Sequence, residues 1–187
     1  MAQDPGTGPL ERVTLLRAGE RSDDIYDEWA DAYEHDLLDE FGYTAHAIAA
    51  DALVAALDDH DAAIVDYGCG TGLVGERLTA AGFTRLDGAD YAPGMLEQCR
   101  AKGVYRHLFV ADLTEPLDVD DATYDALICV GVMGAGHLVP EHFAELFRTV
   151  RPGVPLPTRA TPSASPRSRR PATGRSSPRS SSTTWRR

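Results

Sequence analysis

The chain has 187 residues with a net charge of −11, and its hydrophobic content of 43% is typical of a folded globular protein. No apolar run approaches the roughly 20 residues of a membrane span, and the N-terminus lacks the apolar core of a secretory signal. Up to Val150 there are 9 basic and 29 acidic residues, whereas the last 37 residues hold 9 arginines and no acid. We therefore expect a cytoplasmic protein with reduced cysteines, with no membrane association, and with an acidic body that repels nucleic acid.

Prolines and glycines between residues 5 and 9 predict that residues 1–21 form a flexible N-terminus. Ser22 is a typical N-cap, and a helix with one apolar and aromatic face is predicted from about Asp23 to Glu40. The residues of that face are Ile25, Trp29, Tyr33, Leu37 and Phe41. A second helix is expected from about Tyr43 to Leu57, with Ile48, Ala52 and Ala55 on its inner face.

From residue 62 onwards, short apolar runs alternate with helical patterns. Strands are predicted at 62–65, 86–90, 107–110 and 124–130, and helices at 73–81, 94–102 and 141–150. The buried stripe of the last helix is expected to comprise Phe143, Leu146, Phe147 and Val150. This alternation indicates an α/β fold, a parallel sheet with helices on both faces, in which ligands bind beyond the carboxyl ends of the strands.

A glycine-rich loop, Gly68-Cys69-Gly70-Thr71-Gly72, follows the first predicted strand and Asp66. Glycine at every second position lets the backbone turn sharply and lets a ligand lie against it. The next helix directs its free N–H groups to the same place. A tight turn without a ligand is the plain alternative, and a P-loop is excluded because no Lys-Ser or Lys-Thr follows.

A dinucleotide site is the sharper alternative. The run from Gly70 to Gly75 matches G-x-G-x-x-G, and Asp90, 18 residues after Gly72, stands about where a ribose-binding acid belongs. Taken alone, this loop would suit an NAD-dependent oxidoreductase. The carboxylate of Asp66 favours S-adenosylmethionine instead, because it would repel a pyrophosphate but attract the ammonium and sulfonium of that cofactor.

Three segments resemble motifs of the class I, Rossmann-like S-adenosylmethionine-dependent methyltransferases. They are Val65-Asp66-Tyr67-Gly68-Cys69-Gly70-Thr71-Gly72, Gly88-Ala89-Asp90-Tyr91-Ala92-Pro93-Gly94-Met95-Leu96 and Ala111-Asp112-Leu113. The resemblance implies that Asp90 binds the two ribose hydroxyls and that Asp112 accepts a hydrogen bond from the adenine amine. It also implies that Met95 and Leu113 line the adenine faces. The other cofactor contacts expected from these motifs and the fourth strand are Asp66, Gly68, Cys69, Gly70, Gly72, Tyr91 and Cys129.

Residues 26–37 and 134–138 are similar to the small methyltransferases named after the Williams–Beuren syndrome region and to their bacterial relatives. The resemblance extends from about residue 24 to residue 153. It implies an N-terminal helical cover over the cofactor, with Tyr26 and Tyr33 near its methionine end. Spacing alone places Trp29 and Tyr33 in the core instead, which leaves Tyr26 as the better contact candidate.

Methyl transfer from a sulfonium is an in-line displacement that depends largely on positioning and requires no metal. A general base helps only if the acceptor must lose a proton. His137, after the fourth predicted strand, is the one candidate, although a lone histidine more often simply begins the next helix. The expected function is methylation of a small molecule, and the alternatives are an NAD-dependent oxidoreductase or a non-catalytic cofactor-binding remnant.

The folded pattern ends at Gly153. Residues 154–187 are rich in Arg, Pro and Ser, a composition typical of a disordered tail. The family would continue with a fifth, central strand, so we expect a methyltransferase domain at 22–153 that lacks its C-terminal strands. We interpret the tail as out-of-frame translation rather than as a basic interaction segment. Weak or absent activity and an exposed apolar edge on the fourth strand would follow.

Overall fold

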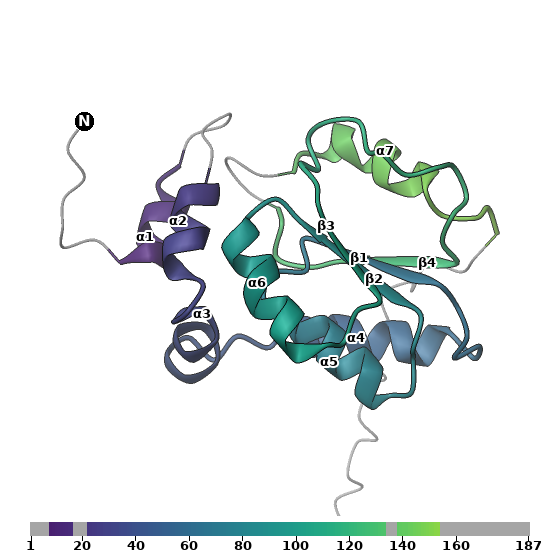
Figure 1. Ribbon diagram of the computed structural model, residues 1–187, viewed down its shortest axis with the longest axis horizontal. Helices are drawn as coiled ribbons and strands as arrows, with labels where there is room; N and C mark the ends of the chain where they lie inside the picture. The colour runs from purple at the N-terminus through teal and green to yellow at the C-terminus, as the bar shows by residue number, and fades with distance from the viewer. Residues whose placement is uncertain (1–7, 17–21, 134–137, 154–187) are drawn as a thin grey trace, which may run out of the picture.

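The computed structural model describes residues 8–16, 22–133 and 138–153, so the tail at 154–187 lies outside the described residues (Figure 1). Residues 9–14, inside the segment expected to be flexible, form a helix, α1 (Pro9–Thr14). Proline at the first helical position favours this start because its φ is already helical. An ion pair of 2.7 Å between Arg12 and Glu28 ties α1 to the next helix. None of the helices in the described ranges is long and apolar enough to cross a membrane.

The sheet has four parallel strands in the order β3-β2-β1-β4. They are β1 (Ile64–Tyr67), β2 (Leu86–Asp90), β3 (His107–Val110) and β4 (Ala126–Cys129). The sequence predicted β2 and β3 with these bounds, but β1 begins two residues later than expected and includes Asp66. The strand order reverses between β1 and β4, so the glycine loop after β1 lies at the topological switch point of the sheet.

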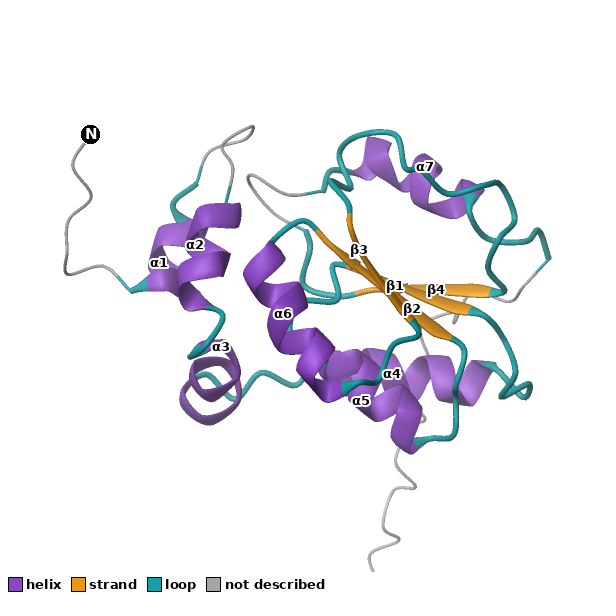
Figure 2. Ribbon diagram, in the orientation of Figure 1, coloured by secondary structure: helices purple, strands orange, loops and turns teal. Residues whose placement is uncertain are grey.

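Helices cover both faces of the sheet, as predicted (Figure 2). On one face lie α4 (Ala45–Ala56) and α5 (Leu73–Ala80), with α6 (Pro93–Lys102) beside α5. The opposite face is covered by α7 (Phe143–Arg148), which follows a short 3-10 turn at Pro140–His142. Alternate side chains of β1 enter the two cores, Ile64 on the α4–α5 side and Val65 on the α7 side.

The single helix expected from Asp23 to Glu40 is broken into three parts. They are α2 (Asp23–Trp29), α3 (Tyr33–His35) and a π-helical turn at Asp36–Glu40. The Trp29 indole donates a 2.6 Å hydrogen bond to Asp36 across the break. Because a π-helical turn has more residues than an α-helical one, the four-residue spacing fails after it, and Phe41 is 53% exposed.

One predicted helix face is wrong, and another is wrong at one residue. In α4 the buried residues are Ala50 and Leu53, whereas Ile48, Ala52 and Ala55 are exposed. Alanine occupies so many positions of this helix that the apolar period is weak, and packing against the sheet decides the orientation. In α7 Leu146 is fully buried, but Phe147 is 43% exposed.

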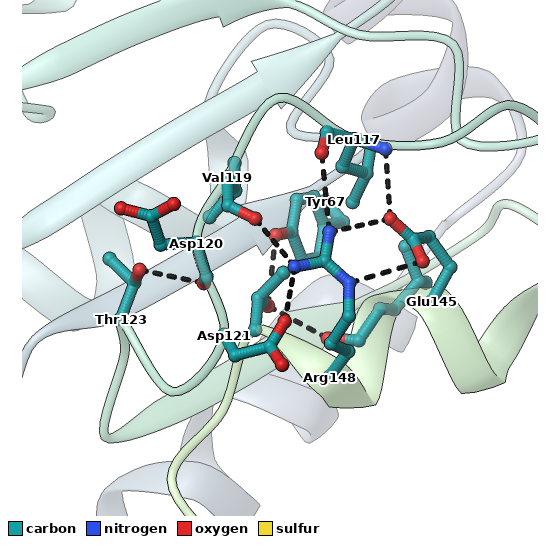
Figure 3. Close-up of polar contacts among 10 residues, drawn as sticks. Tyr67, Leu117, Val119, Asp120, Asp121, Thr123, Glu145 and Arg148 are labelled. Carbon is teal, nitrogen blue, oxygen red and sulfur yellow. Dashed lines mark hydrogen bonds and ion pairs between the residues drawn. The ribbon is translucent and has the colours of Figure 1, made fainter.

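Arg148, at the end of α7, fixes the long connection between β3 and β4 (Figure 3). Its guanidinium donates hydrogen bonds of 2.6–3.2 Å to the carbonyls of Leu117 and Val119 and to the carboxylates of Asp121 and Glu145. Glu145 also accepts a 2.9 Å hydrogen bond from the backbone N–H of Leu117. This network holds residues 111–125, which contain only turns and one bridge residue, against α7.

Candidate cofactor site

The glycine loop has the backbone that its sequence predicts. The φ angles of Gly68, Gly70 and Gly72 are +76°, +53° and +95°, which side chains with a Cβ rarely adopt. The N–H groups of Gly68 and Cys69 both donate to the carbonyl of Ala89, at 2.7 and 3.0 Å, and so fasten the loop to β2. A Cβ on Gly70 would meet only open space, so the loop presents bare backbone there.

Asp90, at the end of β2, joins this loop to the start of α6. Its side chain accepts hydrogen bonds from the N–H of Gly70, at 2.8 Å, and from the N–H of Ala92, at 3.0 Å. Burial raises the pKa of Asp90 above its ordinary value, and the backbone hydrogen bonds oppose that rise. Each carboxylate oxygen retains a lone pair that could accept a ligand hydroxyl.

Asp66 lies inside β1 and is only 2% exposed. Burial raises its pKa to about 7, the negative charge of Asp90 adds to that rise, and a hydrogen bond from Tyr105 opposes it. The Tyr105 hydroxyl lies 2.5 Å from Oδ2 of Asp66. A cation beside Asp66 would favour the ionised carboxylate. Sequence reasoning missed Tyr105, because it stands outside every motif, in the turn before β3.

The N-terminal helices α2 and α3, the cover, lie beside α6 (Figure 1), and the cover carries the aromatic side chains of Tyr26, Trp29 and Tyr33. The ring of Tyr26 lies 6.2 Å from that of Tyr33 and 6.4 Å from that of Tyr91, measured between centroids. Burial raises the pKa values of Tyr26 and Tyr33, and the charge of Asp90 contributes to both shifts. The cover therefore places these rings near the end of β2. Met95 is 2% exposed and belongs to the apolar cluster that Tyr26 and Tyr33 pack against.

Hydrogen bonds also join the cover to α6. Three acidic side chains of the cover accept hydrogen bonds from residues spaced about one turn apart on α6. The pairs are Asp27 with the N–H of Gly94 at 2.6 Å, Asp31 with Gln98 at 2.6 Å, and Glu34 with Lys102 at 2.5 Å. The cover is thus fixed in one register on α6.

The remaining predicted residues lie at the ends of β3 and β4 or outside the described ranges. Asp112, just after β3, accepts hydrogen bonds from the N–H and hydroxyl of Thr114, at 3.0 and 2.6 Å. Leu113 is partly buried against the core on the α7 side. Burial raises the pKa of Cys129, at the end of β4, to about 12, so its thiol stays protonated. His137 lies outside the described residues.

These residues fit S-adenosylmethionine. Two buried carboxylates border a loop with bare backbone, and the N-terminus of α5 follows directly. The hydroxyl of Thr71 in the same loop is buried without a hydrogen-bond partner among the described residues, whereas a buried polar group normally has one. In these ranges no group of three His, Cys, Asp or Glu residues is arranged to hold a metal ion.

Comparison with known proteins agrees with this chemistry. Residues 64–153 match the family described as methyltransferase domain. Human methyltransferase-like protein 27 is 39% identical over 174 residues, which covers 87% of this chain and 70% of the human protein. A chain from the complex between the Haloferax volcanii Trm112 methyltransferase activator and a putative methyltransferase has a TM-score of 0.55 at 26% identity. That match covers 68% of this chain and 56% of the archaeal one.

A second solved structure shares the fold. It is a putative S-adenosyl-L-methionine-dependent methyltransferase from Methanococcus maripaludis, with a TM-score of 0.55 and 15% identity. The match covers 67% of this chain and 59% of the archaeal protein. The chain therefore spans less than two thirds of each of these two solved chains.

Proposed function

Since the chain belongs to the class I S-adenosylmethionine-dependent methyltransferases, we propose that it transfers the methyl group to a small-molecule acceptor. One arrangement carries the proposal: Asp66 and Asp90 come from neighbouring strands and border the loop at Gly70, where the backbone is bare. The bound cofactor would supply an electrophilic methyl group. The protein's part is to bind and orient the two reactants.

The roles of the individual residues follow from their places. Asp90 would accept hydrogen bonds from the two ribose hydroxyls, and Asp66 would face the ammonium of the methionine end. Asp112 would accept a hydrogen bond from the adenine amine, and Leu113 and Met95 would line the adenine faces. Bare backbone at Gly68, Gly70 and Gly72 would lie along the cofactor, next to Cys69. Tyr26, Tyr33, Tyr91 and Cys129 would surround the methionine end, and His137 would act as a base only for an acceptor that loses a proton.

The charge distribution supports a small acceptor over nucleic acid. Residues 1–150 contain 9 basic and 29 acidic side chains, and such a body repels a phosphate backbone. Two of these carboxylates, Asp66 and Asp90, lie in the proposed site itself. A neutral or cationic small molecule meets no such electrostatic barrier.

Calorimetric titration of the full chain with S-adenosylhomocysteine and with NADH tests the cofactor assignment. We expect binding of S-adenosylhomocysteine alone, weakened at least about tenfold in Asp90→Ala because two ribose hydrogen bonds to a charged group are lost. Asp51→Ala is the matched control, since Asp51 is an exposed α4 carboxylate that pairs with Arg77. Unchanged affinity in Asp90→Ala would refute the ribose assignment, and binding of NADH alone would favour an oxidoreductase.

Labelled S-adenosylmethionine then tests the acceptor class. The full chain is incubated with a small-molecule extract, with total RNA or with DNA, and the label is followed. Because weak activity is expected of this chain, we expect slow methyl transfer, with the label in the small-molecule fraction. Label on nucleic acid would contradict the proposal, and cofactor binding without transfer to any fraction would favour a non-catalytic remnant.

A further inference from the structure

Tyr105 joins the cofactor loop to the strands beneath it. It lies in the turn between α6 and β3, and its hydroxyl donates to Oδ2 of Asp66 at 2.5 Å. Its ring packs in the apolar cluster of Cys69, Leu96 and Cys99. The side chain of Tyr105 thus contacts both Cys69, in the glycine loop, and the buried Asp66, which precedes the loop.

Gly75 makes room for the ring of Tyr105, and Gly88 and Gly72 lie beside the same ring. A Cβ on Gly75, in the first turn of α5, would lie 2.4 Å from Cζ of Tyr105, which no real contact allows. A Cβ on Gly88 in β2 would lie 3.3 Å from Cδ1, and one on Gly72 would lie 3.5 Å from Cε2. The ring therefore fills the space between the loop, α5 and β2.

This packing explains the third glycine of the G-x-G-x-x-G match without a dinucleotide. In a dinucleotide site the third glycine allows close packing of helix and strand. Here Gly75 leaves its space to an aromatic ring instead, and the hydroxyl of that ring reaches Asp66. Tyr105 thus accounts for Gly75, whereas a Cβ on Gly70 would meet no atom within 4 Å.

The surroundings of Asp66 make this hydroxyl important. The ionisable groups that face Asp66 are Tyr105, Asp90, Tyr43, Cys69 and Cys129, and none of them is a cation. Among the described residues, Tyr105 is the one hydrogen-bond donor to the Asp66 side chain. A buried carboxylate with a single donor depends strongly on it, because no other group offsets the loss of water.

We propose that Tyr105 is a positioning residue for the cofactor: its ring supports the glycine loop, and its hydroxyl orients the Asp66 carboxylate toward the cofactor's ammonium. The inference rests on the proposed function, in which Asp66 faces that ammonium. The hydrogen bond from Tyr105 lowers the pKa of Asp66, which burial raises to about 7. Without the hydroxyl this pKa rises further, and the carboxylate loses its charge at a higher pH.

Tyr105→Phe tests the proposal because it keeps the ring and removes only the hydroxyl. S-adenosylhomocysteine affinity is measured by calorimetry from about pH 5.5 to pH 8.5. For the natural protein we expect affinity to fall as the pH drops through the titration of Asp66. In Tyr105→Phe the midpoint should move to higher pH, with affinity near neutral pH reduced about tenfold. Adenosine, which has no ammonium, should bind both proteins equally at every pH.

Tyr124→Phe is the matched control. The Tyr124 hydroxyl also donates to a buried carboxylate, that of Asp87 at 3.2 Å, but Tyr124 and Asp87 lie at the opposite end of the strands from the glycine loop. The pH dependence of S-adenosylhomocysteine affinity in Tyr124→Phe should coincide with that of the natural protein. In an Asp66→Asn background, Tyr105→Phe should have no further effect on affinity, because the negative charge that the hydroxyl stabilises is gone.

Two outcomes would overturn the proposal. If Tyr105→Phe binds S-adenosylhomocysteine with the natural pH profile while Asp90→Ala weakens binding, Tyr105 has no positioning role but the proposed function stands. If S-adenosylhomocysteine does not bind the natural chain, both fail together. Should Tyr105→Phe not fold, the carboxyl carbon of Asp66 is followed by NMR in the natural protein. Its titration midpoint should fall when S-adenosylhomocysteine is added, and an unmoved midpoint would overturn the proposal.

Discussion

Gly68 and Val132 lie against each other where the chain leaves β1 and β4: a Cβ on Gly68 would be 2.2 Å from Cγ1 of Val132. The φ of Gly68, +76°, adds a second obstacle to any side chain. We expect Gly68→Ala to lower the free energy of unfolding by about 2–4 kcal/mol, measured by urea denaturation. Gly68→Ala with Val132→Ala should recover part of the loss, because only the positive φ remains. A Gly68→Ala protein as stable as the natural one would show that this contact is not closely packed.

Gly70→Ala should separate binding from stability. Its φ is +53°, but a Cβ there meets no atom within 4 Å, so the fold should lose only about 1–2 kcal/mol. The same methyl group would enter the open space in which we place the cofactor. Calorimetry should therefore show that S-adenosylhomocysteine affinity falls by more than tenfold, whereas urea denaturation shows a modest change. If affinity is retained, the cofactor does not lie against Gly70.

The sequence predicted the sheet well because its signals there are strong. β2 and β3 have the expected bounds, and the alternation of strands and helices indicated the parallel order that places Asp66 and Asp90 at one end of the sheet. Local chemistry determines such features: glycine at every second position lets the loop turn sharply, and Asp66 lies in the second half of β1. The family resemblance was confirmed by the comparisons.

The features that the sequence did not predict depend on contacts between distant segments. Tyr105 contacts Gly75 and Asp66, which lie 30 and 39 positions away in the sequence. No local sequence pattern indicates contacts between such distant residues. The π-helical turn after α3 changes the helical period, so the exposure of Phe41 could not follow from regular spacing. In the alanine-rich α4, tertiary packing rather than an apolar stripe selects Leu53 for burial.

The pairing of Arg148 with Glu145 predicts how stability changes in acid. The Arg148 guanidinium and the N–H of Leu117 lower the pKa of Glu145 to about 2. A lowered pKa in the folded state stabilises the protein above the ordinary carboxyl pKa, and this stabilisation is lost as the pH falls toward 2. Arg148→Met should therefore lower the urea midpoint at pH 6, and the difference from the natural protein should shrink between pH 4.5 and pH 2.5.

Arg151→Met provides the comparison for this acid effect. Arg151 pairs with Asp125 at a half-exposed position, so its removal should change the urea midpoint less at pH 6. If the urea midpoints of Arg148→Met and the natural protein differ by the same amount at pH 6 and pH 2.5, the ion pair of Glu145 with Arg148 does not contribute to stability.

Asp66→Asn should make the unliganded protein more stable while weakening cofactor binding. Burial raises the folded-state pKa of Asp66 to about 7, so folding favours the neutral acid, and stability falls as the pH rises through that value. Asparagine is neutral at every pH, and its amide oxygen can still accept the hydrogen bond from the Tyr105 hydroxyl. Urea denaturation should show a higher midpoint for Asp66→Asn at pH 8 and no difference near pH 4, where Asp66 is itself protonated.

The same variant should bind S-adenosylhomocysteine at least about tenfold more weakly at pH 8, because the ammonium loses its charged partner. Adenosine affinity should be unchanged, which keeps this loss distinct from damage to the fold. A lower urea midpoint at pH 8 would mean that the carboxylate is needed for folding rather than for binding. A higher midpoint together with lost affinity would instead show that the protein retains a destabilising buried acid for the sake of its cofactor.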